Sequence, residues 1–229
     1  MIELLNEDCM AVMDRYPDKY FDLACVDPPY GIGAGSMVMG KGTNKAWGKK
    51  RNWDSAAPSE EYFIEMFRVS KTQIVWGGNY FDLPLTGGWI FWDKERGKDL
   101  SFSDGELAWT SFLTVLRKAP IRFDGFIGAD VVRIHPTQKP IKLYEWLLTN
   151  YAKPGQRILD THLGSGSSAI AAHYFGVDFV GCELDKYYYD AAVKRFEQQT
   201  AQLAMFGPSP PQADTSPSVP IPVTVHVSE

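Results

Sequence analysis

Short apolar runs alternate with helical patterns along most of the chain. The apolar runs predict buried strands at residues 23–26, 73–76, 89–92, 157–160 and 179–183. Apolar residues spaced three and four apart predict helices at residues 58–69, 143–151 and 187–202, and another helix passes through 169–172. Alternating strands and helices are typical of a parallel sheet that is covered on both faces, so the pattern predicts an α/β fold.

Two segments lack this pattern. Residues 31–57 form a long irregular stretch, and loops of that length are usually functional or mobile. Residues 207–229 hold six prolines and no Lys or Arg, which predicts a disordered tail, with a proline-rich ligand for a partner protein as the alternative. We therefore expect one folded domain over residues 1–206.

Composition excludes several protein classes. With 45% hydrophobic and 22% charged residues in 229, the chain is neither wholly disordered nor fibrous. No apolar run is long enough to span a membrane, and the first residues lack the pattern of a signal peptide, so we expect a cytoplasmic protein. Cys9, Cys25 and Cys182 have no metal-ligand spacing, which predicts reduced thiols and no metal site.

The distribution of charge leaves nucleic acid open as a partner. A net charge of −5 argues against it, because phosphate contacts need Lys and Arg. One stretch of eleven residues, however, contains no acid and carries five basic side chains, Lys41, Lys45, Lys49, Lys50 and Arg51. These residues are either a DNA-contacting loop or an ordinary solvated loop.

A glycine-rich turn follows the strand predicted at 157–160 and precedes a helix. Gly164 and Gly166 allow the backbone to approach a ligand closely at the amino end of that helix. Glu183 ends the next strand, about twenty residues later, where a carboxylate can accept hydrogen bonds from ribose hydroxyls. Together they predict a cofactor that contains adenosine, and they leave NAD and S-adenosylmethionine (SAM) equally open.

The tetrapeptide Asp27-Pro28-Pro29-Tyr30 follows the strand predicted at 23–26. Two successive prolines lack N–H groups and fix the backbone, which leaves nearby carbonyls free as acceptors. A carboxylate beside those carbonyls can bind an amine with two hydrogens, and the tyrosine ring can stack on a flat heterocycle. The tetrapeptide therefore suits the exocyclic amine of a nucleobase.

Three motifs in a fixed order resemble those of the amino-methylating DNA methyltransferases. They are Asp-Pro-Pro-Tyr at 27–30, His-Pro-Thr-Gln-Lys-Pro at 135–140, and Leu-Asp with Gly-Ser-Gly within 159–166. The catalytic motif comes first in the chain and the cofactor glycines come last, which is the motif order of the circularly permuted β group. This resemblance spans nearly all of residues 1–206 and implies a Rossmann-like sheet of seven mostly parallel strands, with SAM as cofactor.

The resemblance also implies roles for individual residues. Asp27, Pro28, Pro29 and Tyr30 would be catalytic. The implied cofactor contacts are Asp8, Cys9, Thr137, Lys139, Asp160, Leu163, Gly164, Ser165, Gly166 and Glu183. Asp8 would meet the adenine, Lys139 the methionine carboxylate, and Glu183 the ribose. His162 stands where the family usually has phenylalanine, so it either packs in the core or makes a polar contact with the cofactor.

The expected activity is methyl transfer from SAM to the exocyclic amine of adenine in a base flipped out of double-stranded DNA. Aspartate at the start of the tetrapeptide resembles adenine enzymes more often than cytosine enzymes. The alternatives are the cytosine amine, a catalytically silent DNA- or cofactor-binding module, and methylation of RNA or of protein glutamine. Sequence recognition would come from residues 31–57, residues 94–130 or a second subunit of a homodimer.

Overall fold

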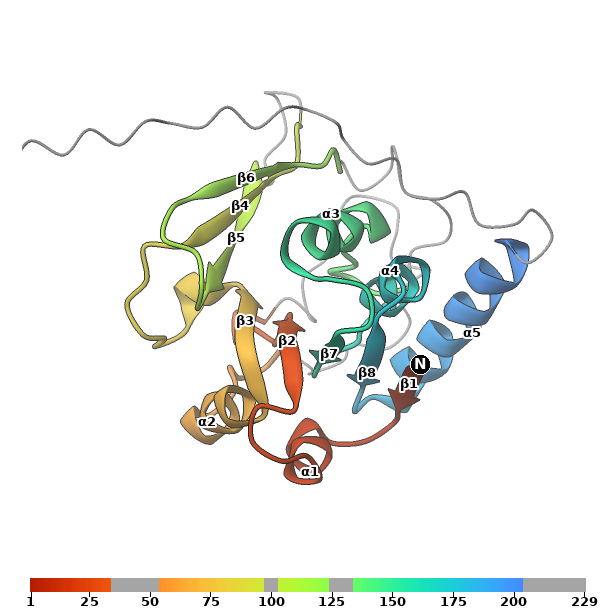
Figure 1. The fold of residues 1–229 in the computed structure, drawn as a ribbon. Helices are drawn as coiled ribbons and strands as arrows, with labels where there is room; N and C mark the ends of the chain where they lie inside the picture. Colours follow the sequence, from red (N-terminus) through yellow and green to blue (C-terminus); the bar gives the residue numbers. More distant parts are fainter. Residues whose placement is uncertain (34–53, 97–102, 124–133, 204–229) are drawn as a thin grey trace, which may run out of the picture.

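The computed structural model describes residues 1–33, 54–96, 103–123 and 134–203. These residues form one sheet of eight strands, five α-helices and a short 3₁₀ helix (Figure 1). The strands are β1 (Ile2–Leu5), β2 (Phe21–Val26), β3 (Ser70–Trp76), β4 (Trp89–Asp93), β5 (Gly105–Thr110), β6 (Arg117–Pro120), β7 (Arg157–Asp160) and β8 (Asp178–Cys182). The helices are α1 (Cys9–Asp14), α2 (Glu60–Val69), α3 (Ile141–Tyr151), α4 (Ser167–Phe175), α5 (Lys186–Leu203) and the 3₁₀ helix η2 (Gly78–Tyr80).

The strand order is β1-β8-β7-β2-β3-β5-β4-β6. Neighbouring strands are parallel except at β5, which is antiparallel to both β3 and β4. The α/β class and the mostly parallel sheet are therefore confirmed, but seven strands is wrong for the described residues. The short, polar β6 stands at the edge of the sheet, where charged residues and a terminal proline are tolerated because one side of the strand needs no partner.

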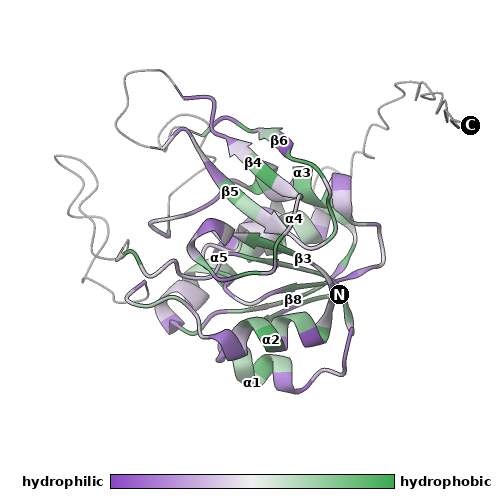
Figure 2. Cartoon of the chain, turned by 90° about the vertical axis from the view of Figure 1, so that its left-hand side faces the viewer, coloured by the Kyte–Doolittle hydropathy of each residue, from purple (hydrophilic) through white to green (hydrophobic). Residues whose placement is uncertain are grey.

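Helices cover both faces of the sheet, as the pattern predicts. On one face α1 and α2 pack over a core that includes Phe21, Met66 and Val75. On the other face α3, α4 and α5 pack over a larger core that includes Trp76 and Leu143. Figure 2 shows β3 and β8 as largely hydrophobic strands, with α1 and α2 on one side of them. Burial on both faces explains why these strands appear in the sequence as continuous apolar runs.

The predicted element boundaries agree with the structure to within a few residues. The helix expected from residue 58 begins at Glu60, and the strand expected to end at Glu183 ends one residue earlier. Cys25 and Cys182 are buried, and Cys9 is half-buried; all three are free thiols. Among the described helices, none combines the length and the apolar composition that a membrane crossing requires.

The topology creates a crevice between β2 and β7. These strands are parallel neighbours, yet the chain continues from β7 through α4 to β8 on one side and from β2 through α2 to β3 on the other. Ligands of open α/β sheets bind outside the carboxyl ends of the strands at such a point. Asp27 follows β2 and Asp160 ends β7, so both lie at this crevice.

Candidate active site

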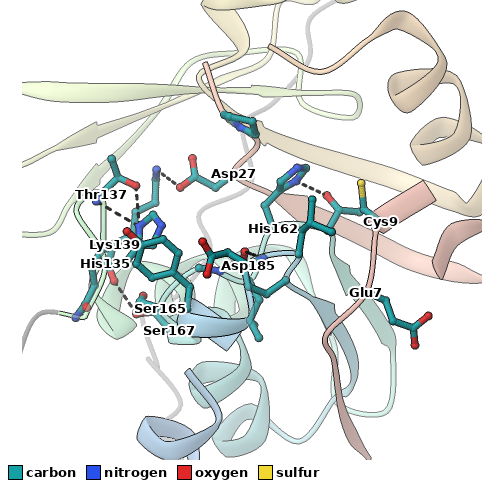
Figure 3. A pocket seen from close by; sticks show the side chains of 18 of the residues that line it. Glu7, Cys9, Asp27, His135, Thr137, Lys139, His162, Ser165, Ser167 and Asp185 are labelled. Atoms are coloured by element: carbon teal, nitrogen blue, oxygen red, sulfur yellow. Dashed lines mark hydrogen bonds and ion pairs between the residues drawn. The ribbon is translucent and has the colours of Figure 1, made fainter. Parts of the chain in front are cut away.

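A cavity of about 410 Å³ lies at this crevice (Figure 3). Small-molecule sites typically have volumes of about 300–1,000 Å³, so the cavity can hold a nucleoside-sized ligand. Of the residues expected from the sequence, it is lined by Asp8, Cys9, Asp27, Pro29, Thr137, Lys139, Leu163, Gly164, Ser165 and Glu183. Two further lining residues, His135 and Gln138, belong to the motif at 135–140. The lining residues that the sequence did not indicate are Glu7, Tyr144, Thr161, Ser167, Leu184, Asp185 and Tyr188.

Asp27 lies on the cavity wall with both carboxylate oxygens hydrogen-bonded. Tyr30 donates its hydroxyl hydrogen to Oδ1 at 2.9 Å, and Lys139 Nζ donates to Oδ2 at 2.7 Å. Burial raises the pKa of Asp27, and the Lys139 ammonium group opposes this shift. A carboxylate has about four lone-pair sites, so Asp27 retains the capacity to accept further hydrogen bonds from a ligand.

Tyr30 is not among the residues that line the cavity. Its ring stacks on Tyr80 with centroids 5.0 Å apart and planes 13° apart. It also lies directly against Gly77, where an added Cβ would come within 2.2 Å of Tyr30 Cε1. Gly77 has φ +67°, so glycine is required there for both reasons. Pro28 also lies outside the lining, and stacking of Tyr30 on a base stays a prediction.

Lys139 connects Asp27 to a second carboxylate. Its Nζ lies 3.0 Å from Glu106 Oε2, and its side chain is only 3% exposed. Burial lowers the pKa of Lys139, but the attraction of Asp27 and Glu106 outweighs burial, so the pKa is raised. The ammonium group therefore bonds to the protein's own carboxylates. The contact of Lys139 with a cofactor carboxylate, which the resemblance implies, stays a prediction. Its ammonium group already has Asp27 and Glu106 as partners.

The glycine turn is held by Glu183. The Gly164 N–H donates to Glu183 Oε2 at 2.9 Å, and the Asp185 N–H donates to Oε1 at 2.9 Å. Gly164 and Gly166 have φ of +52° and +72°, a region that favours glycine. Gly166 lies outside the lining of the cavity and serves as the N-cap of α4. A Cβ added at position 166 would lie 3.3 Å from the Cβ of Ala192.

Asp160 lies beside the cavity and does not line it. Its carboxylate is 1% exposed and accepts hydrogen bonds from Ser168 Oγ at 2.5 Å and from the His162 N–H at 3.1 Å. Burial raises its pKa to about 7, despite these two bonds. It supports the turn that forms the cavity floor.

His162 packs in the core and also lines the cavity, and a polar contact with the cofactor stays a prediction. Its ring packs edge-on against Tyr62 with centroids 5.4 Å apart, and it also lines the cavity. Thr161 Oγ1 lies 2.9 Å from His162 Nδ1 and 2.6 Å from the Tyr62 hydroxyl. Burial lowers the pKa of His162 to about 4, so the imidazole is neutral near neutral pH.

At the other end of the cavity, Asp8 and Cys9 begin α1. Asp8 Oδ1 accepts from the Met10 N–H at 2.9 Å, so Asp8 is the N-cap of the helix. Burial is the main cause that raises the pKa of Cys9 to about 11, which keeps it a thiol rather than a nucleophilic thiolate.

Arg195 on α5 is a supporting residue that the sequence analysis missed. Its Nη1 donates to the Ser165 carbonyl at 2.7 Å and to Ser167 Oγ at 2.9 Å. Ser167 Oγ in turn donates to the Lys139 carbonyl at 2.7 Å. These bonds tie the glycine turn to the segment that carries Lys139. In the sequence, the only signal is a basic residue beside the apolar positions of the helix.

Several expectations concern residues outside those described. The five basic residues proposed to contact DNA, Lys41, Lys45, Lys49, Lys50 and Arg51, are among them. So are parts of the proposed recognition segment 94–130 and the whole tail from 207 to 229. These assignments stay predictions.

Comparisons with known proteins find similarity to DNA methylases. The N6_N4 family of DNA methylases matches residues 83–194. A protein of Escherichia coli (strain K12) named "Putative methylase YubD" is 28% identical over 231 residues, which cover 88% of this chain and 95% of that protein.

Among solved structures, the M1.HpyAVI–SAM complex is similar with a TM-score of 0.56 and 18% identity, over 85% of this chain and 98% of that one. PvuII DNA methyltransferase, described as cytosine-N4-specific, is similar with a TM-score of 0.56 and 13% identity, over 87% of this chain and 90% of that one. The fold is thus the Rossmann-like fold of DNA methyltransferases, and the similarities together support an amino-methyltransferase.

Proposed function

We propose that this chain is a SAM-dependent DNA methyltransferase that acts on the exocyclic amine of adenine. The observation that carries the proposal is the position of the Asp27 carboxylate. It lies on the wall of a cavity that is also lined by a glycine turn and by Glu183. An acceptor for an amine and a site suited to a nucleoside cofactor therefore share one cavity.

The chemistry of the lining fits SAM. Glu183 and Asp8 supply carboxylates for the ribose hydroxyls and the adenine amine, and the glycine turn opens the amino end of α4. Thr137 and Lys139 line the cavity and are the residues proposed to meet the methionine end of SAM; the Lys139 ammonium group is also bonded to Asp27 and Glu106. Asp160 supports the floor of the cavity from within the core.

When bound, SAM supplies an electrophilic methyl group on sulfur; the N–C bond forms as the C–S bond breaks, and the bonding pair stays on sulfur. Asp27 accepts a hydrogen bond from the amine and directs the nitrogen lone pair toward the methyl group. It then receives the proton that the amine releases and passes it to water. Cys9 and Cys25 have raised pKa values because they are buried, so a thiolate nucleophile plays no part.

Adenine and cytosine are the two candidate bases. Aspartate at position 27 resembles adenine enzymes more often, which favours adenine. The similarity to a cytosine-N4-specific enzyme keeps the cytosine amine as the alternative. Either base presents an –NH₂ group, so the role of Asp27 is the same in both cases.

Mass spectrometry of nucleosides tests the proposal. Unmethylated double-stranded DNA is incubated with the purified chain and SAM, then digested. We expect N6-methyladenine; an N4-methylcytosine peak would keep the mechanism and change the base. No modified nucleoside, together with SAM binding measured by calorimetry, would favour RNA as the substrate or a catalytically silent module.

We also expect DNA affinity to fall as salt rises. If the basic stretch from Lys41 to Arg51 contacts phosphates, log K should decline with log salt by about 0.9 per phosphate neutralised. A titration with the chain in which Lys49, Lys50 and Arg51 are replaced by glutamine should give a shallower slope. An affinity that is independent of salt would contradict phosphate contacts by these basic residues.

A further inference from the structure

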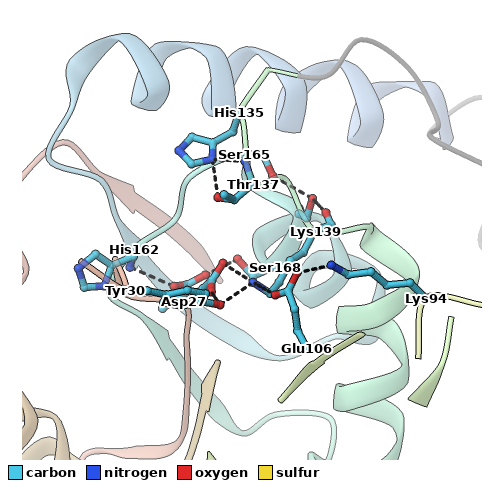
Figure 4. Close-up of polar contacts among 12 residues, drawn as sticks. Asp27, Tyr30, Lys94, Glu106, His135, Thr137, Lys139, His162, Ser165 and Ser168 are labelled. Atoms are coloured by element: carbon cyan, nitrogen blue, oxygen red, sulfur yellow. Dashed lines mark hydrogen bonds and ion pairs between the residues drawn. The ribbon is translucent and has the colours of Figure 1, made fainter. Parts of the chain in front are cut away.

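A line of alternating charges leads from Asp27 away from the cavity (Figure 4). Lys139 Nζ lies between Asp27 Oδ2 at 2.7 Å and Glu106 Oε2 at 3.0 Å. Lys94 Nζ then binds the other oxygen of Glu106, Oε1, at 2.6 Å. Glu106 and Lys94 do not line the cavity. They therefore have no place in a mechanism restricted to residues that can touch the ligand.

The antiparallel direction of β5 places Glu106 there. Parallel strands bring their carboxyl ends to the edge of the sheet at the cavity, whereas β5 brings its amino end to this edge. Glu106 is the second residue of β5 and pairs with Trp92 of β4, and Lys94 follows β4 directly. Two neighbouring strands thus deliver a carboxylate and an ammonium group behind Lys139.

The Glu106 carboxylate and the Lys139 ammonium group hold each other in the charged form. Burial alone would raise the pKa of Glu106, but Lys139 and Lys94 lower it to about 2. Glu106 and Asp27 together raise the pKa of Lys139. A buried ammonium group that lost one of its two carboxylates would keep the cost of desolvation and lose part of the compensation. The position of Lys139, and so of Asp27, depends on Glu106.

We propose that Glu106 is a positioning residue for methyl transfer: it holds Lys139 against Asp27 and so fixes the Asp27 carboxylate for the incoming amine. Glu106 acts through Lys139 and does not touch the ligand. The reaction that it serves rests on the proposed function, whereas the coupling from Glu106 to Asp27 can be measured without any reaction.

Glu106→Gln in the full chain tests the proposal, because glutamine keeps the shape and loses the charge. We expect the single-turnover rate on DNA to fall on the order of tenfold, with SAM affinity unchanged by calorimetry. We also expect the Asp27 carboxyl, followed by ¹³C NMR and assigned with Asp27→Asn, to titrate at higher pH. Lys139, no longer held by Glu106, would contact Asp27 less, and the loss of its ammonium group, which lowers the pKa of Asp27, outweighs the loss of the weaker repulsion from Glu106.

A loss of packing alone would not produce that titration shift. The groups that face Asp27 and share in its titration are Cys25, Tyr30, Glu106, Lys139, Tyr144 and Asp160. Asp93→Asn is the matched control, since Asp93 lies on β4, forms its ion pair with Lys118 and stands outside this line of charges. We expect it to change neither the rate nor the titration.

The outcomes separate this proposal from the proposed function. If the unchanged chain methylates no DNA or RNA, the proposed function fails, and the Asp27 titration still decides the coupling. If the Glu106→Gln variant transfers methyl groups more slowly but Asp27 titrates at the same pH as in the unchanged chain, the proposal is overturned in favour of a purely structural role for Glu106. A moved titration with an undiminished rate would overturn it as well, because positioning would then be irrelevant to transfer.

Discussion

Replacing Asp27 with alanine is expected to slow single-turnover methyl transfer by about 10²-fold or more, with SAM affinity nearly unchanged. Asp27 is the carboxylate on the cavity wall that both meets the amine and accepts its proton in the proposed reaction. The cofactor contacts proposed for Glu183, Asp8 and the glycine turn come from other strands and helices. We therefore expect this variant to lose methyl transfer and to retain SAM binding.

The comparison is sharpest with two further variants. Asp27→Asn keeps the size of the side chain and removes its charge. We therefore expect the rate of methyl transfer to fall by a similar factor, without the empty space that alanine would leave at position 27. Asp22→Asn is the control, because Asp22 lies on β2, the strand that precedes Asp27, binds Lys71 at 2.7 Å and does not line the cavity. Rates come from radiolabelled methyl transfer with enzyme in excess. An Asp27→Ala rate above about a tenth of the original would contradict the role assigned to Asp27.

The sequence was sufficient to locate the two ends of the cavity. Asp27 and Glu183 each follow a short apolar run, and Gly164 lies in a turn before a helix. The carboxyl ends of parallel strands gather at one edge of a sheet, and in the structure all three residues line one cavity. The catalytic and cofactor-binding roles expected for them stay predictions.

The support behind Asp27 could not be predicted in the same way. Glu106 and Lys94 are ordinary charged residues in segment 94–130, where the sequence pattern placed no strand. Their meeting with Lys139 depends on the antiparallel direction of β5 and on its register with β4. No local pattern encodes either property. The motif that carries Lys139 places it at the cavity but does not reveal its ion-pair partners, and its implied contact with the cofactor stays a prediction.

The contacts of Tyr30 could not be predicted from the sequence either. Its position after the prolines suggests a ring that is free to stack on a base, whereas the structure stacks it on Tyr80 and packs it against Gly77. The Trp-Gly-Gly-Asn-Tyr segment that supplies both contacts lies almost fifty residues away in the chain. Contacts between distant segments of this kind depend on packing rather than on local sequence.

Asp160→Asn is expected to stabilise the fold at neutral and alkaline pH. Burial raises the pKa of Asp160 to about 7, so the folded chain keeps a proton on this carboxyl that the unfolded chain has already released. Folding therefore becomes less favourable as pH rises from the unfolded pKa, about 4, to the folded pKa, by about 1.4 kcal/mol for each pH unit. Asparagine carries no such charge and escapes this loss.

Denaturant unfolding at about pH 5 and about pH 8 measures the effect. The stability of Asp160→Asn relative to the unchanged chain should rise by roughly 3 kcal/mol between the two conditions. Asp14→Asn, at an exposed position in α1, is the control, because an exposed carboxylate remains hydrated on folding. An equal difference at both pH values would mean that Ser168 and the His162 N–H hold Asp160 ionised in the folded chain, and that the carboxylate is part of a stable polar floor beneath the cavity.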